Sequence, residues 1–154
     1  MTMLIYSENP AANFNYEILD KYEAGIVLTG AEVKSIKTNG LSLKSSYVKI
    51  MSNEEVYLLN SHISKYKPAN NTQQNYDPER SRKLLLNKRE INKLIGKVQD
   101  KGLTIVPLKV YAKGRNIKIE IALARGKKLY DKRDDMKKKE EKRRAERAMK
   151  LGEY

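Results

Sequence analysis

Basic side chains are concentrated in one short stretch of the chain, between residues 80 and 97. Seven of them fall within 18 residues: Arg80, Arg82, Lys83, Lys88, Arg89, Lys93 and Lys97. Guanidinium groups can pair with phosphate oxygens through two hydrogen bonds, and a row of cations can follow a nucleic-acid backbone. This spacing on helices favours phosphate binding. The alternative is a solvated face balanced by Glu79 and Glu90.

A second basic segment, residues 126–133, contains one aromatic side chain, Tyr130. Its neighbourhood offers too little apolar surface to form a core, so we expect Tyr130 to stack on an unpaired base. Residues 134–150 carry acid-before-base pairs four residues apart, which predict a helix that orders only on a polyanion. The alternative for this segment is a disordered solubilising tail.

Groups that could carry out catalysis are sparse. The chain has no cysteine and a single histidine, His62, which excludes thiol chemistry and histidine-pair metal sites. The adjacent carboxylates Glu54–Glu55 and Asp134–Asp135 could hold Mg²⁺ in a nuclease, but neighbouring side chains on an exposed element diverge. No glycine-rich phosphate loop is present. We therefore expect a protein that is not an enzyme and has no cofactor or metal.

The overall charge indicates the class of partner. The 154 residues carry a net charge of +13, which predicts a nucleic acid or an anionic membrane as the partner. Residues 1–124 contribute +7 and residues 125–154 contribute +6, so we expect a folded domain over 1–124 and a basic C-terminal tail over 125–154. The first 13 residues show no secretory pattern and no apolar run is long enough to span a bilayer, so a cytoplasmic protein is expected.

Within residues 1–124, alternating apolar residues predict strands. The segment 117–123 alternates strictly, 103–111 is a β-branched run with an edge or bulge at Pro107, and residues 114–116 form the turn between them. A second hairpin is predicted from 47–51 and 56–63, and 16–28 gives two short strands or one strand bent at Gly25. About six short strands of this kind favour a small closed barrel.

Helices are predicted where capping signals flank an apolar repeat. One spans 29–37 and stops at Asn39–Gly40, a second opens at Asp77–Pro78 and spans 79–86, and a third starts at Asn87 and ends near Gly102. The polar segment 64–76 is expected to be an exposed loop.

Several motifs in order along the chain resemble those of the SmpB family, the SsrA-binding (tmRNA-binding) proteins of bacteria. They are EAGI at 23–26, GAEVKSIK at 30–37, SY at 46–47, NxHI at 60–63, DPERSRKLLL at 77–86, VPL at 106–108 and GKK…DKR at 126–133. The resemblance covers about residues 9–150. Three positions depart from it: Pro10–Ala11 replaces two basic residues, Ala31 replaces Thr or Trp, and Asn87 replaces a frequent His.

The resemblance implies a mainly β fold: an oligonucleotide-binding-like closed antiparallel barrel with three helices and a tail that is disordered when free and helical when bound. It implies an RNA-binding adaptor of trans-translation that binds the tRNA-like domain of tmRNA and delivers it to ribosomes stalled on non-stop mRNA. The barrel would mimic the anticodon arm, and the tail would engage the decoding centre and the mRNA channel. The expected partners are tmRNA and the ribosome with its small-subunit rRNA, with no membrane and a monomeric protein.

Site residues follow from the same resemblance. Asn9, Glu23 and Leu85 match positions implicated in tmRNA binding, and the predicted tmRNA set also includes Lys34, Arg80, Arg82 and Lys83. Leu85 is expected to be a support beneath the contact surface, with simple core packing as the alternative. For Glu23 the alternative is an ion pair with Lys21. The predicted ribosome-binding set is Lys127, Lys128, Tyr130, Asp131, Lys132, Arg133 and Met149. The competing functions are a general barrel-type RNA-binding or ribosome-assembly protein and a Mg²⁺-dependent nuclease.

Overall fold

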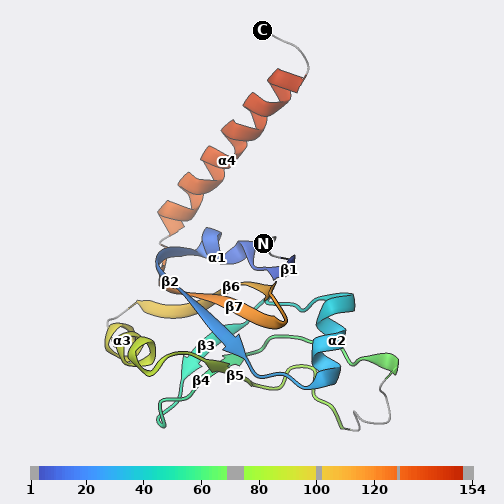
Figure 1. Ribbon diagram of the computed structural model, residues 1–154. Helices are drawn as coiled ribbons and strands as arrows, with labels where there is room; N and C mark the ends of the chain where they lie inside the picture. The colour runs from blue at the N-terminus through green and yellow to red at the C-terminus, as the bar shows by residue number, and fades with distance from the viewer. Residues whose placement is uncertain (1–3, 69–74, 100–101, 128, 151–154) are drawn as a thin grey trace.

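Six antiparallel strands close into a ring. The computed structural model describes residues 4–68, 75–99, 102–127 and 129–150. The ring order is β6 (Leu103–Lys113), β3 (Tyr47–Ile50), β4 (Val56–Leu59), β5 (Arg82–Leu85), β2 (Tyr16–Ile26) and β7 (Asn116–Gly126), and pairing of β7 with β6 closes it. A seventh strand, β1 (Leu4–Glu8), is not part of the ring and pairs with residues 109–112 of β6 (Figure 1). The predicted closed antiparallel barrel of about six strands is confirmed.

The long β6–β7 hairpin has the predicted turn and the predicted irregularity. Gly114 adopts a φ of 61° in the turn, a conformation that glycine reaches without steric cost. The register between the two strands shifts between Pro107 and Lys109, because proline has no amide hydrogen to donate to the ladder. Alternate residues of β7, such as Ile119 and Ile121, point into the barrel and are fully buried.

Three helices accompany the barrel: α1 (Pro10–Asn15), α2 (Gly30–Asn39) and α3 (Lys88–Val98). A capping box starts α2, in which the Thr29 hydroxyl accepts from the Glu32 amide at 3.1 Å and the Glu32 carboxylate accepts from the Thr29 amide at 3.0 Å. At the start of α3 the Asn87 amide donates to the Glu90 carboxylate at 3.2 Å. Figure 1 shows α2 and α3 on opposite sides of the barrel.

The helix predicted over residues 79–86 is wrong. The Asp77 carboxylate accepts from the Glu79 amide at 2.9 Å, and the Asp77 carbonyl accepts from the Arg80 amide at 3.2 Å, so the Asp–Pro pair forms a turn. The chain then enters β5, where Arg82 and Leu84 point inward and Leu85 points outward. Aspartate followed by proline is typical both of the start of a helix and of a tight turn, and at Asp77–Pro78 the turn forms.

The tail forms a fourth helix, α4 (Leu129–Lys150), which projects away from the barrel on the side of α1 (Figure 1). The helix predicted for 134–150 is therefore present and begins earlier. Strand β7 continues to Gly126, so the composition change near Ala124 falls inside the last strand. No helix of the described segments is long and apolar enough to cross a membrane. Disorder of the tail in the free protein stays a prediction.

A buried ion cluster joins α2 to β5. The Glu32 carboxylate has no exposed surface and accepts from Arg82 Nε at 3.0 Å and from Arg80 Nε at 3.1 Å. Tyr76 donates its hydroxyl hydrogen to the same carboxylate at 3.0 Å, and the Arg82 guanidinium continues to the Ser61 carbonyl at 2.9 Å. Every buried side-chain nitrogen and oxygen of the described residues has a hydrogen-bond partner. The cluster is therefore fully satisfied, as a buried charge requires.

The cluster sets the ionisation of its members. Burial alone would raise the pKa of Glu32, but hydrogen bonds from Arg80, the Thr29 amide and Arg82 outweigh it and lower the pKa to about 2. Burial and the nearby Glu32 charge raise the pKa of Tyr76 to about 12. At neutral pH, Glu32 is therefore charged and Tyr76 is a neutral donor.

We expect acid to weaken the fold through Glu32. Because its folded pKa lies below the ordinary value of 4.5, its contribution is fully present above pH 4.5 and is lost as the pH falls toward 2. The shift corresponds to about 3 kcal/mol. Urea unfolding between pH 7 and pH 2.5 measures this loss, and Glu32→Gln should lower stability at pH 7 by about 3–5 kcal/mol and flatten the acid dependence.

Glu79→Gln is the matched control, because the Glu79 side chain is 65% exposed. Parallel pH profiles for the wild type and Glu32→Gln would show that the carboxylate does not carry the acid sensitivity.

Candidate nucleic-acid interface

The basic residues predicted to form one phosphate-binding stripe are divided by the structure. Arg82 is fully buried on the inward side of β5, so the prediction that it lies on the exposed stripe is wrong; its guanidinium is bound to Glu32. Arg80 is bound to the same carboxylate and its side chain is one-third exposed. Lys83 points outward and pairs with Glu55 at 3.4 Å. Of these three cations, Arg80 and Lys83 have the exposed surface that contact with RNA requires.

Glu23 lies on the outward face of β2 and is held by two donors. The hydroxyl of Tyr111, on β6, donates to one carboxylate oxygen, and the Lys113 ammonium contacts the other at 3.0 Å. These hydrogen bonds, the one from Tyr111 first, lower the pKa of Glu23. The alternative of an ion pair with Lys21 is not what the structure shows. Glu23 is an ionised, oriented acceptor, suited to 2′-hydroxyl and base amino donors.

Tyr111 holds the Glu23 carboxylate in place, and no motif of the sequence predicts this role. Its side chain lies across β7, because its own cross-strand partner is Lys118 whereas its hydroxyl reaches Glu23 on β2. Tyr111 is 2% exposed, and the Lys109 ammonium lies 5.7 Å from its ring centroid. Burial, and then the hydrogen bond to Glu23, raises the pKa of Tyr111, so it remains a donor. Only the register of three strands brings these residues together, and no local sequence signal encodes it.

Leu85 is 54% exposed on β5, so it lies at the surface itself, and both the predicted support beneath the surface and the alternative of simple core packing are wrong. It pairs with Gly25 across β2 and β5, and a Cβ added to Gly25 would lie 3.3 Å from the Leu85 Cβ. Glycine therefore lets Leu85 lie flat on the β2 backbone. Leu85 borders a hollow of about 310 Å³ whose lining also includes Val33 and Arg115. The result is an apolar contact point with basic residues beside it.

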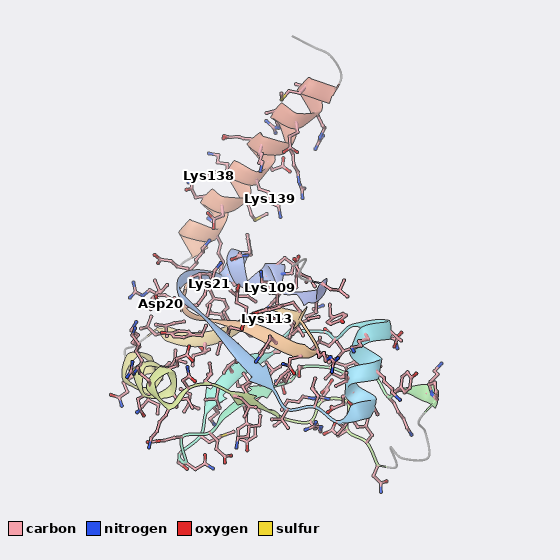
Figure 2. All side chains as sticks on the ribbon, viewed as in Figure 1. Asp20, Lys21, Lys109, Lys113, Lys138 and Lys139 are labelled. Atoms are coloured by element: carbon pink, nitrogen blue, oxygen red, sulfur yellow. The ribbon has the colours of Figure 1, made fainter. Side chains whose placement is uncertain are left out.

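Asn9 and Lys34 lie at two other places on the barrel. Asn9 is held beside α1 by its side-chain amide, which donates to the Pro107 carbonyl at 2.9 Å, and it borders a polar hollow of about 260 Å³ with Lys21 and Lys109. Figure 2 shows Lys21 and Lys109 close to α1. Lys34 is exposed on α2, one residue beyond Val33 of the Leu85 hollow, with its ammonium 6.0 Å from the centroid of the Tyr66 ring.

The start of the tail is bound to α1 through Lys127. Its amide donates to the Asn15 carbonyl at 2.9 Å, its ammonium donates to the Asn13 carbonyl at 3.0 Å, and it forms an ion pair with Asp135 of α4. Phe14 of α1 and Met136 of α4 line one hollow. Lys127, predicted to contact the ribosome, is 19% exposed because it joins the barrel to the tail.

The other predicted tail residues differ in what the structure shows. Lys128 lies outside the described residues, as do the side chains of Tyr130 and Asp131. Lys132 is half-buried, Arg133 is exposed and Met149 is 71% exposed. Lys138 and Lys139 lie along the same helix in Figure 2.

The carboxylates considered for a metal are separated or already paired. Glu55 accepts from the Tyr57 hydroxyl at 2.6 Å and from Lys83, Asp134 pairs with Lys138 at 3.5 Å, and Asp135 is bound to Lys127. In the described part of the chain, no three His, Cys, Asp or Glu side chains lie close enough together to hold a metal ion.

Comparison with known proteins decides the family. The family model described as SmpB protein matches residues 6–151. The chain belongs to the SmpB family. It is 53% identical over 146 residues to the SsrA-binding protein of Thermosynechococcus vestitus, covering 95% of each chain, and 52% identical over 150 residues to that of Acaryochloris marina, covering 96% of this chain and 95% of that one.

A solved structure of the SmpB family has the same fold. The chain is similar to one in the structure described as "tmRNA-SmpB: a journey to the center of the bacterial ribosome", with 46% identity and a TM-score of 0.65. The similarity covers 80% of this chain and 85% of that chain.

In this SmpB-family chain, we expect Tyr111→Phe to raise the pKa of Glu23 toward its ordinary value. The substitution removes the hydroxyl that stabilises the ionised carboxylate and leaves the ring in place. Carboxyl NMR titration of Glu23 measures the change. Tyr47→Phe, on an exposed ring of β3, is the control. An unchanged Glu23 titration in Tyr111→Phe would show that Tyr111 does not hold the carboxylate.

We expect Lys127→Gln to loosen the base of α4. The substitution removes the ion pair with Asp135 and weakens the contact with the Asn13 carbonyl. Spin labels at positions 49 and 143 should give a broader distance distribution than in the unsubstituted chain. Lys138→Gln removes an exposed pair within α4 and should leave that distribution unchanged. Equal distributions for all three proteins would contradict the anchoring role of Lys127.

Proposed function

We propose that this chain is an RNA-binding adaptor of trans-translation. It binds the tRNA-like domain of tmRNA and delivers it to ribosomes stalled on non-stop mRNA, with the barrel in the position of an anticodon arm and the tail in the decoding centre and mRNA channel. The observation that carries this proposal is the SmpB family match over residues 6–151, together with relatives named SsrA-binding protein that align over nearly their whole length.

The geometry supports a division of work between a barrel that ends with β7 at Gly126 and a tail beyond it, two residues after the boundary predicted between 124 and 125. The barrel presents an ionised carboxylate at Glu23, an apolar contact at Leu85 and exposed cations, a combination suited to structured RNA. The tail helix projects beyond the barrel and is almost entirely exposed and basic (Figure 1). An arrangement of this kind lets one protein touch two RNAs at once.

We assign the tmRNA contacts to Asn9, Glu23, Lys34, Arg80, Lys83 and Leu85, and give Arg82 a role in holding the fold. The ribosome contacts belong to the tail, including Tyr130, Lys132, Arg133 and Met149. The protein acts as a monomer in the cytoplasm and carries out no chemistry itself. Peptide transfer belongs to the ribosome.

We expect removal of residues 128–154 to leave tmRNA binding within about threefold and to abolish peptide tagging on a non-stop message. The truncation keeps all of β7 and the contact between Lys127 and Asn15. Binding is measured by gel competition between tmRNA and total tRNA at about 0.15 M salt, and tagging is measured in a reconstituted translation system. Thermal unfolding of the truncated chain checks that the barrel is intact.

The outcomes separate the proposal from its competitors. Loss of tmRNA binding in a folded truncated protein would contradict the division between barrel and tail. Equal affinity for tmRNA and unrelated stem-loops would favour a general RNA-binding protein. RNA cleavage that disappears with EDTA and in Glu54→Gln/Glu55→Gln would favour a nuclease.

A further inference from the structure

The outer face of α3 is a row of cations, of which Lys93 acts at longer range on the Asp20 carboxylate. Lys88, Arg89 and Lys93 are exposed, and within the described residues none of them forms an ion pair. The acidic residue of this helix, Glu90, accepts from the Asn87 amide at its own N-terminus. By contrast, Arg80, Arg82, Lys83 and Lys97 of the same basic cluster are all paired with carboxylates. The unbalanced charge of the cluster therefore lies on α3.

A glycine lies on the same face of α3, beyond Lys93 and near the C-terminal end of the helix. Gly96 is exposed, is two residues from the end of α3, and has no described atom within 4 Å of the place where a Cβ would lie. Glycine destabilises a helix interior relative to alanine. Close packing explains Gly25 under Leu85, but no such neighbour is present at Gly96. The open space leaves the helix backbone at Gly96 accessible to a partner molecule.

The start of α3 lies just after the exposed Leu85 of β5. Leu85 pairs with Gly25 near the end of β2. At the other end of α3 the Lys97 ammonium contacts the Asp20 carboxylate, on the earlier part of β2, at 2.7 Å. Asp20 lies on the face of β2 that carries the buried Ala24, whereas Glu23 lies on the opposite, outward face. Helix α3 contacts β6, with buried Leu94 turned toward the core, and its first cations, Lys88 and Arg89, follow Leu85 within four residues.

We propose that the outer face of α3 is a phosphate-binding surface for the backbone of tmRNA, with Lys88, Arg89 and Lys93 pairing with phosphates and Gly96 allowing the sugar–phosphate chain to approach the helix closely. This rests on the proposed function, because it extends the barrel's tmRNA contact beyond Glu23 and Leu85. The arginine supplies a forked donor and the lysines supply point charges. The bare helix backbone at Gly96, about one turn beyond Lys93, permits an approach that any larger side chain would block.

The charge part is tested with the triple variant Lys88→Gln/Arg89→Gln/Lys93→Gln in the full-length chain. We expect at least tenfold weaker tmRNA binding at about 0.15 M salt. The log–log slope of affinity against salt should fall by about 2 to 3, since each phosphate contact contributes nearly one unit. The matched control is Lys44→Gln/Lys49→Gln/Lys67→Gln, which removes three other exposed cations and the same net charge.

The shape part is tested at Gly96 without any change of charge. Gly96→Ala and Gly96→Gln should both raise the melting temperature, because each is a better helix former than glycine. Both should nevertheless weaken tmRNA binding, Gly96→Gln by at least about tenfold, because its side chain fills the space that the backbone needs. A substitution that stabilises the protein and damages binding cannot be explained by misfolding.

The outcomes distinguish this inference from the proposed function. A cation triple variant that binds tmRNA as the control triple does would overturn the surface on α3. Gly96→Gln with a raised melting temperature and unchanged binding would overturn the close approach. In either case a wild-type chain that still prefers tmRNA to total tRNA leaves the proposed function standing, whereas loss of that preference in the wild type itself would overturn the proposed function.

Discussion

The barrel depends on one buried carboxylate. Glu32 lies at the first turn of α2, and through Arg80, Arg82 and Tyr76 it connects that helix to β5 and to the segment before it. A buried carboxylate cannot move far from its donors, because no water is present to replace a hydrogen bond that is lost. The cluster therefore fixes the inward side of β5. Once Arg82 points inward, Leu85 must point outward, and the outer surface around Gly25 follows from the same alternation.

Ion pairs within the fold reduce the charge available for nucleic acid. Four basic residues between positions 80 and 97 are paired with three carboxylates, those of Glu32, Glu55 and Asp20. What remains on the barrel is a small number of exposed cations around an ionised carboxylate that Tyr111 orients. A uniformly basic surface would hold any RNA, whereas a mixed surface with fixed acceptors discriminates by hydrogen bonding. The paired cations thus belong to the fold and the unpaired ones remain for recognition.

Elements with local signals were predictable and elements that depend on distant partners were not. The β6–β7 hairpin, the helix over 29–37 and the start of α3 at Asn87 each follow from neighbouring residues, and the structure has them. Strand β5 was predicted as a helix because Asp77–Pro78 fits both a turn and a helix start. The partner of Arg82 is 50 positions away and that of Tyr111 is 88 positions away, so neither contact leaves a pattern in the sequence. The family resemblance supplied Glu23 and Leu85 but not what holds them.

The contacts of Lys127 with α1 fix how far the tip of α4 lies from the barrel. Helix α4 has 22 residues, so it measures about 33 Å from base to tip. Because its base is fixed on α1, the length of the helix sets the distance between the barrel surface and the molecule that the tip contacts. Inserting one residue near the base would lengthen the helix by only about 1.5 Å but would rotate the side chains at its tip by about 100° about the helix axis. The direction in which the side chains at the tip point, and not only their distance, is therefore fixed relative to the barrel.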